Sequence, residues 1–272
     1  MSGNQADFSG DIPRDYDDGL GPILFAGHAA DMARRAAASG GTPTRVLETA
    51  AGTGVLTRAL RDALPVRAHL TATDLNAPML DIARTKFRAD EDVVFQPADA
   101  TALPFPNGSF DTIVCQFGVM FYPDKDKGYR EARRVLVFGG RYLFSVWDSH
   151  CHNSFGRIAH EVIGSFFPDD PPRFYEVPFS YYQIDPIKES LLAAGFGEVK
   201  VSVDRLHRPV ADFSAFARGI VFGNPVFDQI RQRGGAAPSD VQQAVAAAMR
   251  REFGGEPGVV PTQAITFESR KL

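Results

Sequence analysis

The stretch Arg45–Thr57 joins a carboxylate to a loop that has almost no side chains. It reads RVLETAAGTGVLT, so an apolar run with Glu48 near its end is followed by small residues and then by a helical pattern. Glycine permits the φ values that a sharp turn from strand to helix needs, and small residues let a ligand lie on the backbone. The next helix offers free N–H groups and a positive dipole end to a carboxylate or phosphate. The stretch predicts a ligand-binding loop, with an ordinary strand-to-helix turn as the alternative.

Two further acidic side chains stand where strands are expected to end. Asp74 lies 20 residues after Gly54, and Asp99 follows the next apolar run. Ligands of parallel α/β sheets bind outside the carboxyl ends of the strands, so these carboxylates are expected at one edge. Asp74 can accept hydrogen bonds from both hydroxyls of a ribose. Asp99 can accept from an adenine amino group or can cap a helix N-terminus.

Two of the six histidines follow the fifth predicted strand. His150 and His152 stand just beyond Trp147-Asp148, at the same expected edge. They are therefore the candidate general bases, with ordinary surface loop residues as the alternative. Cys151 lies between them, but three ligands this close without a distant fourth are poor spacing for structural zinc. No metal site is predicted.

An alternation of apolar strands and helices supplies the scaffold for these residues. The first five predicted strands are connected by helices over residues 55–64, 77–87 and 125–137, the last of them stopped at Gly139-Gly140. This pattern is typical of a parallel sheet with helices on both faces. The predicted fold is α/β, a Rossmann-like doubly wound, mostly parallel sheet of seven strands at residues 45–49, 69–74, 93–95, 111–115, 141–147, 198–206 and 263–268.

Helical segments interrupt this rhythm before and after the core. A helix from near Pro22 to Ala38, ended by the sequence at residues 39–43, predicts an N-terminal arm or lid. The two later insertions are each too short for an independent domain, so one domain is predicted. Its parts are the arm at 1–43, a ligand-binding core at 44–148, helical cap insertions at 149–182 and 208–260, and the rest of the sheet at 183–207 and 261–272.

Composition and charge narrow the classes of function. The chain has 272 residues and a formal net charge of -4, which argues against general affinity for nucleic acid or anionic membrane. Its first residues have neither the basic region nor the apolar run of a secretory signal, and no apolar run approaches membrane-spanning length. Cys115 and Cys151 do not form a CxxC pair. We expect a cytoplasmic protein without membrane insertion, whose oligomeric state the sequence leaves open.

Two ligand classes fit a glycine-rich loop followed by an acidic residue, namely dinucleotides and S-adenosylmethionine. The dinucleotide fingerprint needs a third glycine where this chain has Thr57. With Glu48-x-Ala50-x-Gly52-x-Gly54, the sequence instead resembles the class I S-adenosylmethionine-dependent methyltransferases, in particular the group that includes the ubiquinone/menaquinone-biosynthesis C-methyltransferases. The resemblance covers about residues 45–148 and continues in order through Leu75–Leu80, Ala98–Phe105, Phe110–Phe121 and Arg130–Arg141.

The resemblance implies a cofactor site built from the ends of four strands. Glu48 and the small-residue loop hold the methionine end of S-adenosylmethionine, and Asp74 holds the ribose. The family has glycine where this chain has Ala50, so the loop geometry is expected to differ there. The implied cofactor-binding residues are Glu48, Ala50, Gly52, Thr53 and Gly54 for the methionine end, Asp74 for the ribose, Leu75, Met79, Ala98, Asp99 and Ala100 around the adenine, and Gln116 and Phe117 beside the sulfonium.

These features predict methyl transfer by in-line displacement to a small apolar or aromatic metabolite. The fourth strand runs into Gln116-Phe117-Gly118-Val119, where methyltransferases of amide or exocyclic nitrogens often carry Asn/Asp-Pro-Pro-aromatic. A nucleic-acid substrate is therefore not expected. The Phe- and Tyr-rich insertions predict either an apolar substrate cavity or simply a packed core. The alternatives are an NAD(P)-dependent oxidoreductase and a non-catalytic S-adenosylmethionine-binding module.

Overall fold

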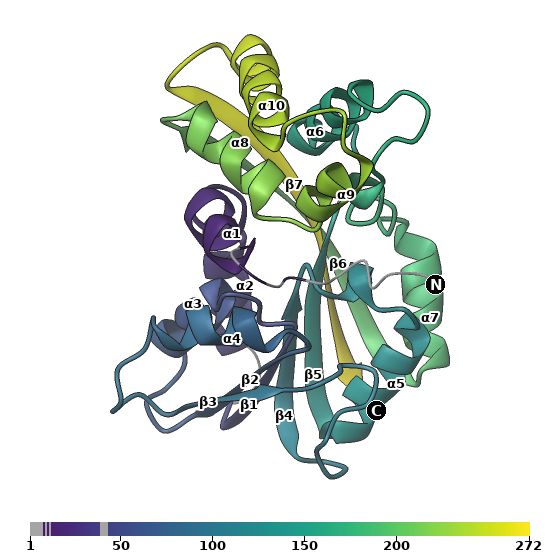
Figure 1. Ribbon diagram of the computed structural model, residues 1–272. Coiled ribbons are helices and arrows are strands. Elements are labelled where there is room, and N and C mark those ends of the chain that lie inside the picture. The colour runs from purple at the N-terminus through teal and green to yellow at the C-terminus, as the bar shows by residue number, and fades with distance from the viewer. Residues whose placement is uncertain (1–7, 9, 11, 39–42) are drawn as a thin grey trace. The chain divides into compact units, whose positions relative to one another are not determined.

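A single mixed sheet runs through the chain (Figure 1). The computed structural model describes residues 8, 10, 12–38 and 43–272, and parts of the predicted arm (1–7, 9, 11 and 39–42) lie outside these residues. Within the described part, seven strands follow the order β3-β2-β1-β4-β5-β7-β6. The ladders that join β1 to β5 are parallel, so the predicted Rossmann-like α/β fold is confirmed. The strands are β1 Arg45–Thr49, β2 His69–Asp74, β3 Val93–Pro97, β4 Phe110–Gln116, β5 Leu136–Trp147, β6 Phe196–Val210 and β7 Gly258–Lys271.

The strand order reverses between β1 and β4, which is where open α/β sheets bind ligands. The register places Glu48 of β1 between Ala72 of β2 and Val114 of β4. The carboxyl ends of the three strands therefore lie at one edge. The sheet brings together the chain segments that carry most of the predicted cofactor residues.

The helices largely follow the predicted alternation, although the bounds of several helices and strands differ from the prediction. The first helix begins at Ile12 instead of near Pro22, because Pro22 lies inside a π-helical turn, Gly21–Phe25, that directly follows a helix ending at Leu20. The bounds are α1 Ile12–Leu20, α2 Ala26–Ala38, α3 Val55–Ala63, α4 Ala77–Arg84, α5 Lys125–Val135, α6 Ser154–Ser165, α7 Ile184–Ala193, α8 Phe213–Phe222, α9 Val226–Arg233 and α10 Pro238–Phe253, with short 3₁₀ turns η2 at Val119–Phe121 and η3 at Phe174–Glu176.

Two strands begin earlier than predicted: β5 begins five residues before the predicted Arg141, and β7 begins five residues before the predicted Gln263. Phe110 pairs with Leu136 and Thr112 pairs with Arg141, so two residues of β4 span five of β5. Gly139, with a φ of 76°, lies within this irregular part of the strand. The Gly139-Gly140 pair is therefore a bulge inside a strand and not the stop of a helix.

The chain divides into two compact units. We call residues 1–27, 147–181 and 205–263 the helical unit, and residues 28–146, 182–204 and 264–272 the sheet unit. The helical unit overlaps the predicted cap insertions at 149–182 and 208–260. The description of the whole chain as one domain with a cap stays a prediction.

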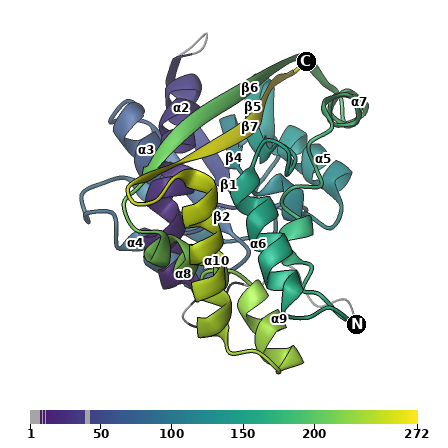
Figure 2. The same cartoon turned by 90° about the horizontal axis from the view of Figure 1, so that it is seen from above.

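Apolar packing covers both faces of the sheet in the sheet unit. Figures 1 and 2 show α2, α3 and α4 on one face and α5 and α7 on the other. Under the first group, Met32 of α2 and Leu60 of α3 are buried against Val46, Leu70 and other strand residues. The opposite face carries a stack of aromatic rings, in which Phe144 and Phe267 lie 5.0 Å apart between ring centroids. Burial on both faces makes the strand ends rigid supports for a site.

Aromatic side chains form much of the core of the helical unit. Phe155 contacts Trp147, Phe179 and Phe216 at ring-centroid distances of 5.8, 5.6 and 6.3 Å. All four are less than 9% exposed. Of the two roles predicted for the aromatic-rich insertions, the packed core accounts for these residues.

A buried polar network fixes the end of β5 to β7 within the helical unit. The Asn153 amide donates to the carbonyl oxygens of Asp148 (2.9 Å) and Gln263 (3.0 Å), and it accepts from the Gln263 N–H (2.9 Å). The Gln263 amide donates to the Asp148 carboxylate at 2.6 Å. Because the buried groups are mutually satisfied, this network can hold the segment that carries His150 in place.

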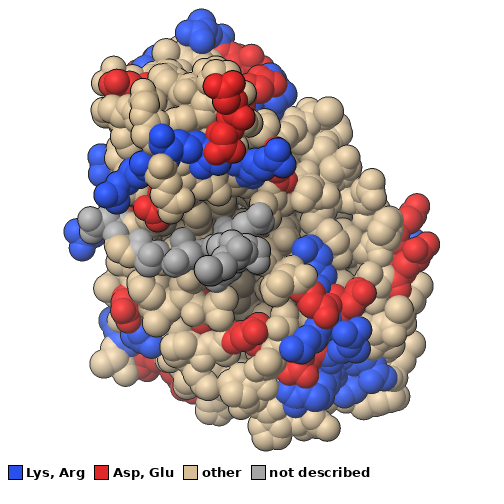
Figure 3. Space-filling model, turned by 45° about the vertical axis from the view of Figure 1, so that its right-hand side comes forward, with Lys and Arg blue, Asp and Glu red and all other residues tan. Residues whose placement is uncertain are grey.

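The surface is mixed in charge. On the face shown in Figure 3, acidic and basic side chains are interspersed. In the part of the chain that the structure describes, no helix is long and apolar enough to cross a membrane.

The contact between α1 and α8 generates a first prediction. A Cβ on Gly219 would lie 2.9 Å from the backbone of Gly19, so Gly219→Ala should lower the free energy of unfolding by about 2 kcal/mol through overpacking. Gly164→Ala is the matched control, because its Cβ would meet only Pro171 at 3.6 Å. The free energy of unfolding of this control should be unchanged or should rise by about 0.5–1 kcal/mol, because alanine has a higher helix propensity than glycine.

Urea unfolding followed by the fluorescence of Trp147, the single tryptophan, reports on the helical unit. Equal midpoints for the two variants would contradict the packing of α1 on α8.

Candidate functional site

The small-residue loop follows β1 with several residues in the left-handed region. Ala50, Gly52 and Gly54 have φ values of 52°, 55° and 81°, and Gly54 is the N-cap of α3. The Ala51 N–H donates to the carbonyl of Thr73 at 2.9 Å, which ties the loop to β2. An alanine in this conformation costs about 1 kcal/mol more than glycine. At Ala50 the chain thus keeps a left-handed backbone despite the added methyl group.

Gly118 provides the room that the Ala50 methyl group needs. A Cβ on Gly118 would lie 2.4 Å from the Ala50 Cβ and 2.8 Å from the Cys115 Sγ. Gly118 itself has a φ of -98°, which any residue can adopt, so its small size and not its backbone requires glycine. This pairing could not be predicted from the sequence, because no motif or spacing indicates that these two positions touch.

Glu48 is a buried acid beside the loop. It is 1% exposed, and its Oε2 atom has no hydrogen-bond partner among the described residues; the same holds for the buried hydroxyls of Thr53 and Thr57. Burial, and after it the negative charge of Asp74, raises the pKa of Glu48 to about 8. A buried carboxylate with spare acceptor capacity suits a ligand that brings a cation, such as the ammonium of an amino acid.

The Asp74 carboxylate holds the loop and the start of α4 together. Its Oδ2 accepts from the Gly52 N–H and its Oδ1 from the Asn76 N–H, both at 2.8 Å. Burial raises the pKa of Asp74, and these backbone N–H groups oppose the rise. Carboxylate oxygens have more lone pairs than these bonds use, so Asp74 can also accept from ribose hydroxyls.

The residues predicted around an adenine lie next to Asp74. The Ala98 N–H donates to the Asp74 carbonyl at 2.9 Å, which places the end of β3 beside the end of β2. Leu75 is 56% exposed and Met79 only 3%. Asp99 is exposed, and its Oδ1 accepts from the N–H and hydroxyl of Thr101, both at 2.8 Å. Asp99 therefore caps a turn with one oxygen, which is close to the alternative role predicted for it.

The end of β4 carries Gln116 and Phe117, the residues predicted beside the sulfonium. Phe117 has a φ of 55°, and its N–H donates to the Ser145 carbonyl of β5 at 2.9 Å. The ring of His28, a buried residue of α2, lies edge-on to the Phe117 ring at 5.6 Å. The position of His28 could not be predicted from the sequence, because α2 precedes β1 and follows none of the strand ends.

A buried hydrogen-bonded group supports the loop from below. The Tyr122 hydroxyl lies 3.1 Å from the Thr49 hydroxyl and 3.4 Å from the Cys115 Sγ. Burial raises the pKa values of both Cys115 and Tyr122, so these groups stay neutral at ordinary pH. The group links the ends of β1 and β4 without adding charge.

The candidate bases and the predicted cofactor residues belong to different units of the chain. His150 and His152 belong to the helical unit, whereas all the predicted cofactor residues belong to the sheet unit. A His150 ring nitrogen lies 3.1 Å from the Tyr175 carbonyl, and burial, then the nearby His160, lowers the pKa of His150. His152 is exposed. Their role as bases stays a prediction. Among the described residues, no group of three His, Cys, Asp or Glu could hold a metal ion.

The chain is similar to a family of known proteins and to several named relatives. A family model described as a methyltransferase domain matches residues 46–140. The demethylmenaquinone methyltransferase of Thermus thermophilus is 39% identical over 43% of this chain and 53% of its own length, and the Deinococcus radiodurans one is 36% identical over 46% and 53%. The chain thus spans about half the length of these two relatives. The ubiquinone/menaquinone biosynthesis C-methyltransferase UbiE of Shewanella frigidimarina is 36% identical over 57% of this chain and 67% of its own length.

Two solved structures share the fold. The YcgJ protein from Bacillus subtilis has a TM-score of 0.59 and 20% identity, with 90% of this chain and 98% of that one covered. The phosphoethanolamine N-methyltransferase 2 of Haemonchus contortus, in complex with phosphomonomethylethanolamine and S-adenosylhomocysteine, has a TM-score of 0.60 and 16% identity, with 95% and 56% covered. At these identities the likeness concerns the fold alone.

The raised pKa of Glu48 generates a second prediction. The group titrates near pH 8 in the folded protein and near 4.5 when exposed, so the folded state holds the proton more tightly. The free energy of unfolding therefore falls as pH rises between these values. Glu48→Gln has no carboxyl group to titrate at this position, so this fall does not occur in the variant. Between pH 5 and pH 8 its free energy of unfolding should rise by about 3 kcal/mol relative to that of wild type.

Urea unfolding of both proteins at the two pH values measures this difference. Asp126→Asn, at a residue that is exposed in α5, is the control and should follow wild type. A constant difference between Glu48→Gln and wild type would show that Glu48 is not a buried neutral acid.

The contact of Ala50 with Gly118 generates a third prediction. Gly118→Ala should lower the free energy of unfolding by about 2 kcal/mol, because its Cβ would clash with that of Ala50. Ala50→Gly alone should be nearly neutral, since relief of the left-handed strain offsets the greater freedom of glycine in the unfolded chain.

The double variant should recover about 1 kcal/mol of the loss, the Cys115 contact accounting for the rest. A double-mutant cycle by thermal unfolding measures this coupling, and strictly additive effects would be inconsistent with the contact.

Proposed function

Because this chain belongs to the class I S-adenosylmethionine-dependent methyltransferases, we propose that it transfers the methyl group of S-adenosylmethionine to a small aromatic or apolar molecule. The observation that carries the proposal is the pair of buried carboxylates, Glu48 and Asp74, on either side of a loop with left-handed backbone. Glu48 has an unpartnered oxygen that can pair with a cation, and Asp74 can accept hydrogen bonds from vicinal hydroxyls. S-adenosylmethionine has both an ammonium group and the vicinal hydroxyls of a ribose.

The residues of the sheet unit would divide the cofactor between them. Glu48, with the Thr53 hydroxyl and the loop N–H groups, would hold the amino acid end. Asp74 would hold the ribose, with Met79 and the backbone of Ala98 and Ala100 around the adenine, while Leu75 would cover the exposed side. Gln116 and Phe117 would flank the sulfur.

Glu48 also has a protonation step in this scheme. Its raised pKa means that it carries a proton before a ligand binds. An ammonium group beside it favours the ionised form, so Glu48 gives up its proton to solvent on binding. The charge of the carboxylate then appears only when a cation is there to pair with it, which avoids an unpaired buried charge.

The bound cofactor supplies a methyl group that the positive sulfur already activates, so that placement of the acceptor supplies much of the rate. Placement is the task of the protein. The strained backbone at Phe117 and the buried His28 against its ring define a rigid aromatic wall at the end of β4. Such a wall suits a flat acceptor.

We propose that the acceptor is a ring carbon of a reduced quinone or a similar phenol. The names of the Thermus, Deinococcus and Shewanella relatives support this class. Methylation at such a carbon requires that a proton leaves the acceptor, which calls for a base. His150 and His152 are the bases predicted from sequence, and His28 is added because it lies against Phe117.

Transfer from radiolabelled S-adenosylmethionine tests this function. A panel should contain reduced demethylnaphthoquinones, simple phenols, aliphatic amines and a histone peptide. We expect label in the ring of the quinols or phenols. Label confined to the amines or the peptide would contradict the acceptor class, and the absence of transfer to every member would contradict the activity.

The ribose assignment generates a fourth prediction. Asp74→Ala removes the carboxylate acceptor and the bond to the Gly52 N–H, so the affinity for S-adenosylhomocysteine should fall about 100-fold. Asp74→Asn keeps one acceptor oxygen, so its affinity for S-adenosylhomocysteine should be only about 10-fold lower than that of wild type. Asp126→Asn, on the exposed face of α5, should bind like wild type.

Isothermal titration calorimetry measures these affinities, and circular dichroism confirms that each variant is folded. Unchanged affinity in Asp74→Ala would refute the role of Asp74 at the ribose.

A further inference from the structure

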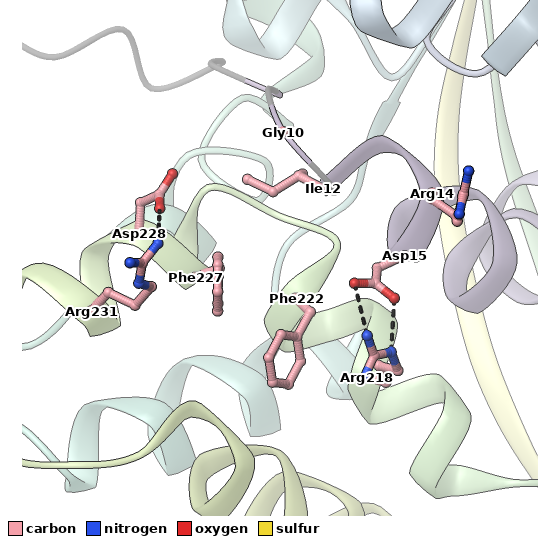
Figure 4. Close-up of a pocket in the computed structure, with 9 residues that line it drawn as sticks. All are labelled: Gly10, Ile12, Arg14, Asp15, Arg218, Phe222, Phe227, Asp228 and Arg231. Atoms are coloured by element: carbon pink, nitrogen blue, oxygen red, sulfur yellow. Dashed lines mark hydrogen bonds and ion pairs between the residues drawn. The ribbon is translucent and has the colours of Figure 1, made fainter. Parts of the chain in front are cut away.

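A hollow of about 590 Å³ lies within the helical unit (Figure 4). Residues of α1, α8 and α9 line it. Its volume falls in the range of small-molecule sites, which is about 300–1,000 Å³. No residue assigned to the cofactor lines it, so cofactor binding does not account for the hollow.

Two aromatic rings and two guanidinium groups form one continuous wall of the hollow. The rings of Phe222 and Phe227 lie 5.1 Å apart between centroids. Arg218 lies over the Phe222 ring at 4.9 Å, and Arg231 lies over the Phe227 ring at 5.5 Å. Figure 4 shows the four side chains on neighbouring turns of α8 and α9. Both rings are partly exposed, so a flat molecule can stack on the same wall.

Charged side chains of both signs line the hollow. Asp15 pairs with Arg218 through two hydrogen bonds of 2.7 and 3.2 Å. Asp228 lies 4.0 Å from Arg231, which is too long for a hydrogen bond and leaves the Arg231 donors available. Arg14 also lines the hollow, and it has no ion-pair partner among the described residues. The described residues that line the hollow thus include three arginines and two aspartates.

We propose that this hollow binds a flat aromatic molecule that carries a carboxylate. The ring would stack on the Phe222–Phe227 wall, and the carboxylate would accept hydrogen bonds from Arg231, which lies beside Phe227 (Figure 4). Guanidinium groups match a carboxylate in geometry as well as charge. A neutral aromatic molecule would leave the arginines without an anion, and a small inorganic anion would leave the rings unused.

Isothermal titration calorimetry with 2-naphthoate tests the proposal on the full chain. Wild type should bind the probe, and the affinity should fall as salt rises. Arg231→Gln should bind about 10-fold more weakly, because it loses a charge-assisted hydrogen bond. Phe227→Leu should bind about 5-fold more weakly through lost stacking. Arg251→Gln, an exposed residue of α10 outside the hollow, is the matched control and should bind like wild type.

Two comparison probes distinguish the contribution of the rings from that of the charge. The amide 2-naphthamide has the same rings without charge, and inorganic phosphate has charge without rings. We expect both to bind at least about 10-fold more weakly than 2-naphthoate. Equal binding of either probe, unchanged affinity in Arg231→Gln, or no binding of 2-naphthoate at millimolar concentration would overturn the proposal. Asp74→Ala should bind 2-naphthoate like wild type, which keeps this test independent of the proposed methyl transfer.

Discussion

The hydrogen bond from the Gly52 N–H to the Asp74 carboxylate is the contact on which the ligand edge of the sheet depends. It fixes the small-residue loop of β1 to the end of β2. The second oxygen of the same carboxylate fixes the start of α4, and the carbonyl of Asp74 receives the N–H of Ala98 at the end of β3. One residue thus sets the relative positions of three segments. Because this residue is an acid in a buried position, the arrangement carries an electrostatic cost that a hydrogen-bonding ligand would reduce.

The neighbouring strand ends carry backbone strain that packing maintains. Ala50 and Phe117 are non-glycine residues in the left-handed region, and they follow adjacent strands. Gly118 leaves space for the Ala50 methyl group, while Tyr122 and Thr49 hold the strand ends from below. Strain of this kind gathers at functional sites, where the surrounding structure over-determines the backbone. The combination keeps the loop in one shape before a ligand arrives.

Local signals in the sequence predict the first half of the sheet closely. The bounds of β1 and β2 agree with the prediction, because short apolar runs there end at small residues or at an acidic residue followed by a helix cap. The predicted start of β5 was wrong, since a glycine pair indicates a stop as readily as a bulge and only the pairing with β4 decides. The first helix also begins earlier than predicted, because a proline does not reveal a π-helical turn.

The sequence also predicts some features of the candidate site and not others. Glu48 and Asp74 follow strands directly, so the parallel topology alone predicts that they share an edge. The contact of Ala50 with Gly118 and that of His28 with Phe117 join segments far apart in the chain, and no spacing rule links them. The Arg and Phe wall of the helical unit was missed for the same reason. Its residues lie on neighbouring helices, and none of them follows a motif.

Calorimetric titration of the wild-type protein with S-adenosylhomocysteine, and separately with NADH, tests the central claim most directly. We expect saturable binding of S-adenosylhomocysteine with release of a proton from Glu48, seen as a dependence of the measured heat on the ionisation enthalpy of the buffer near pH 7. We expect no saturable binding of NADH. Tight binding of NADH without a response to S-adenosylhomocysteine would contradict the assignment of the site.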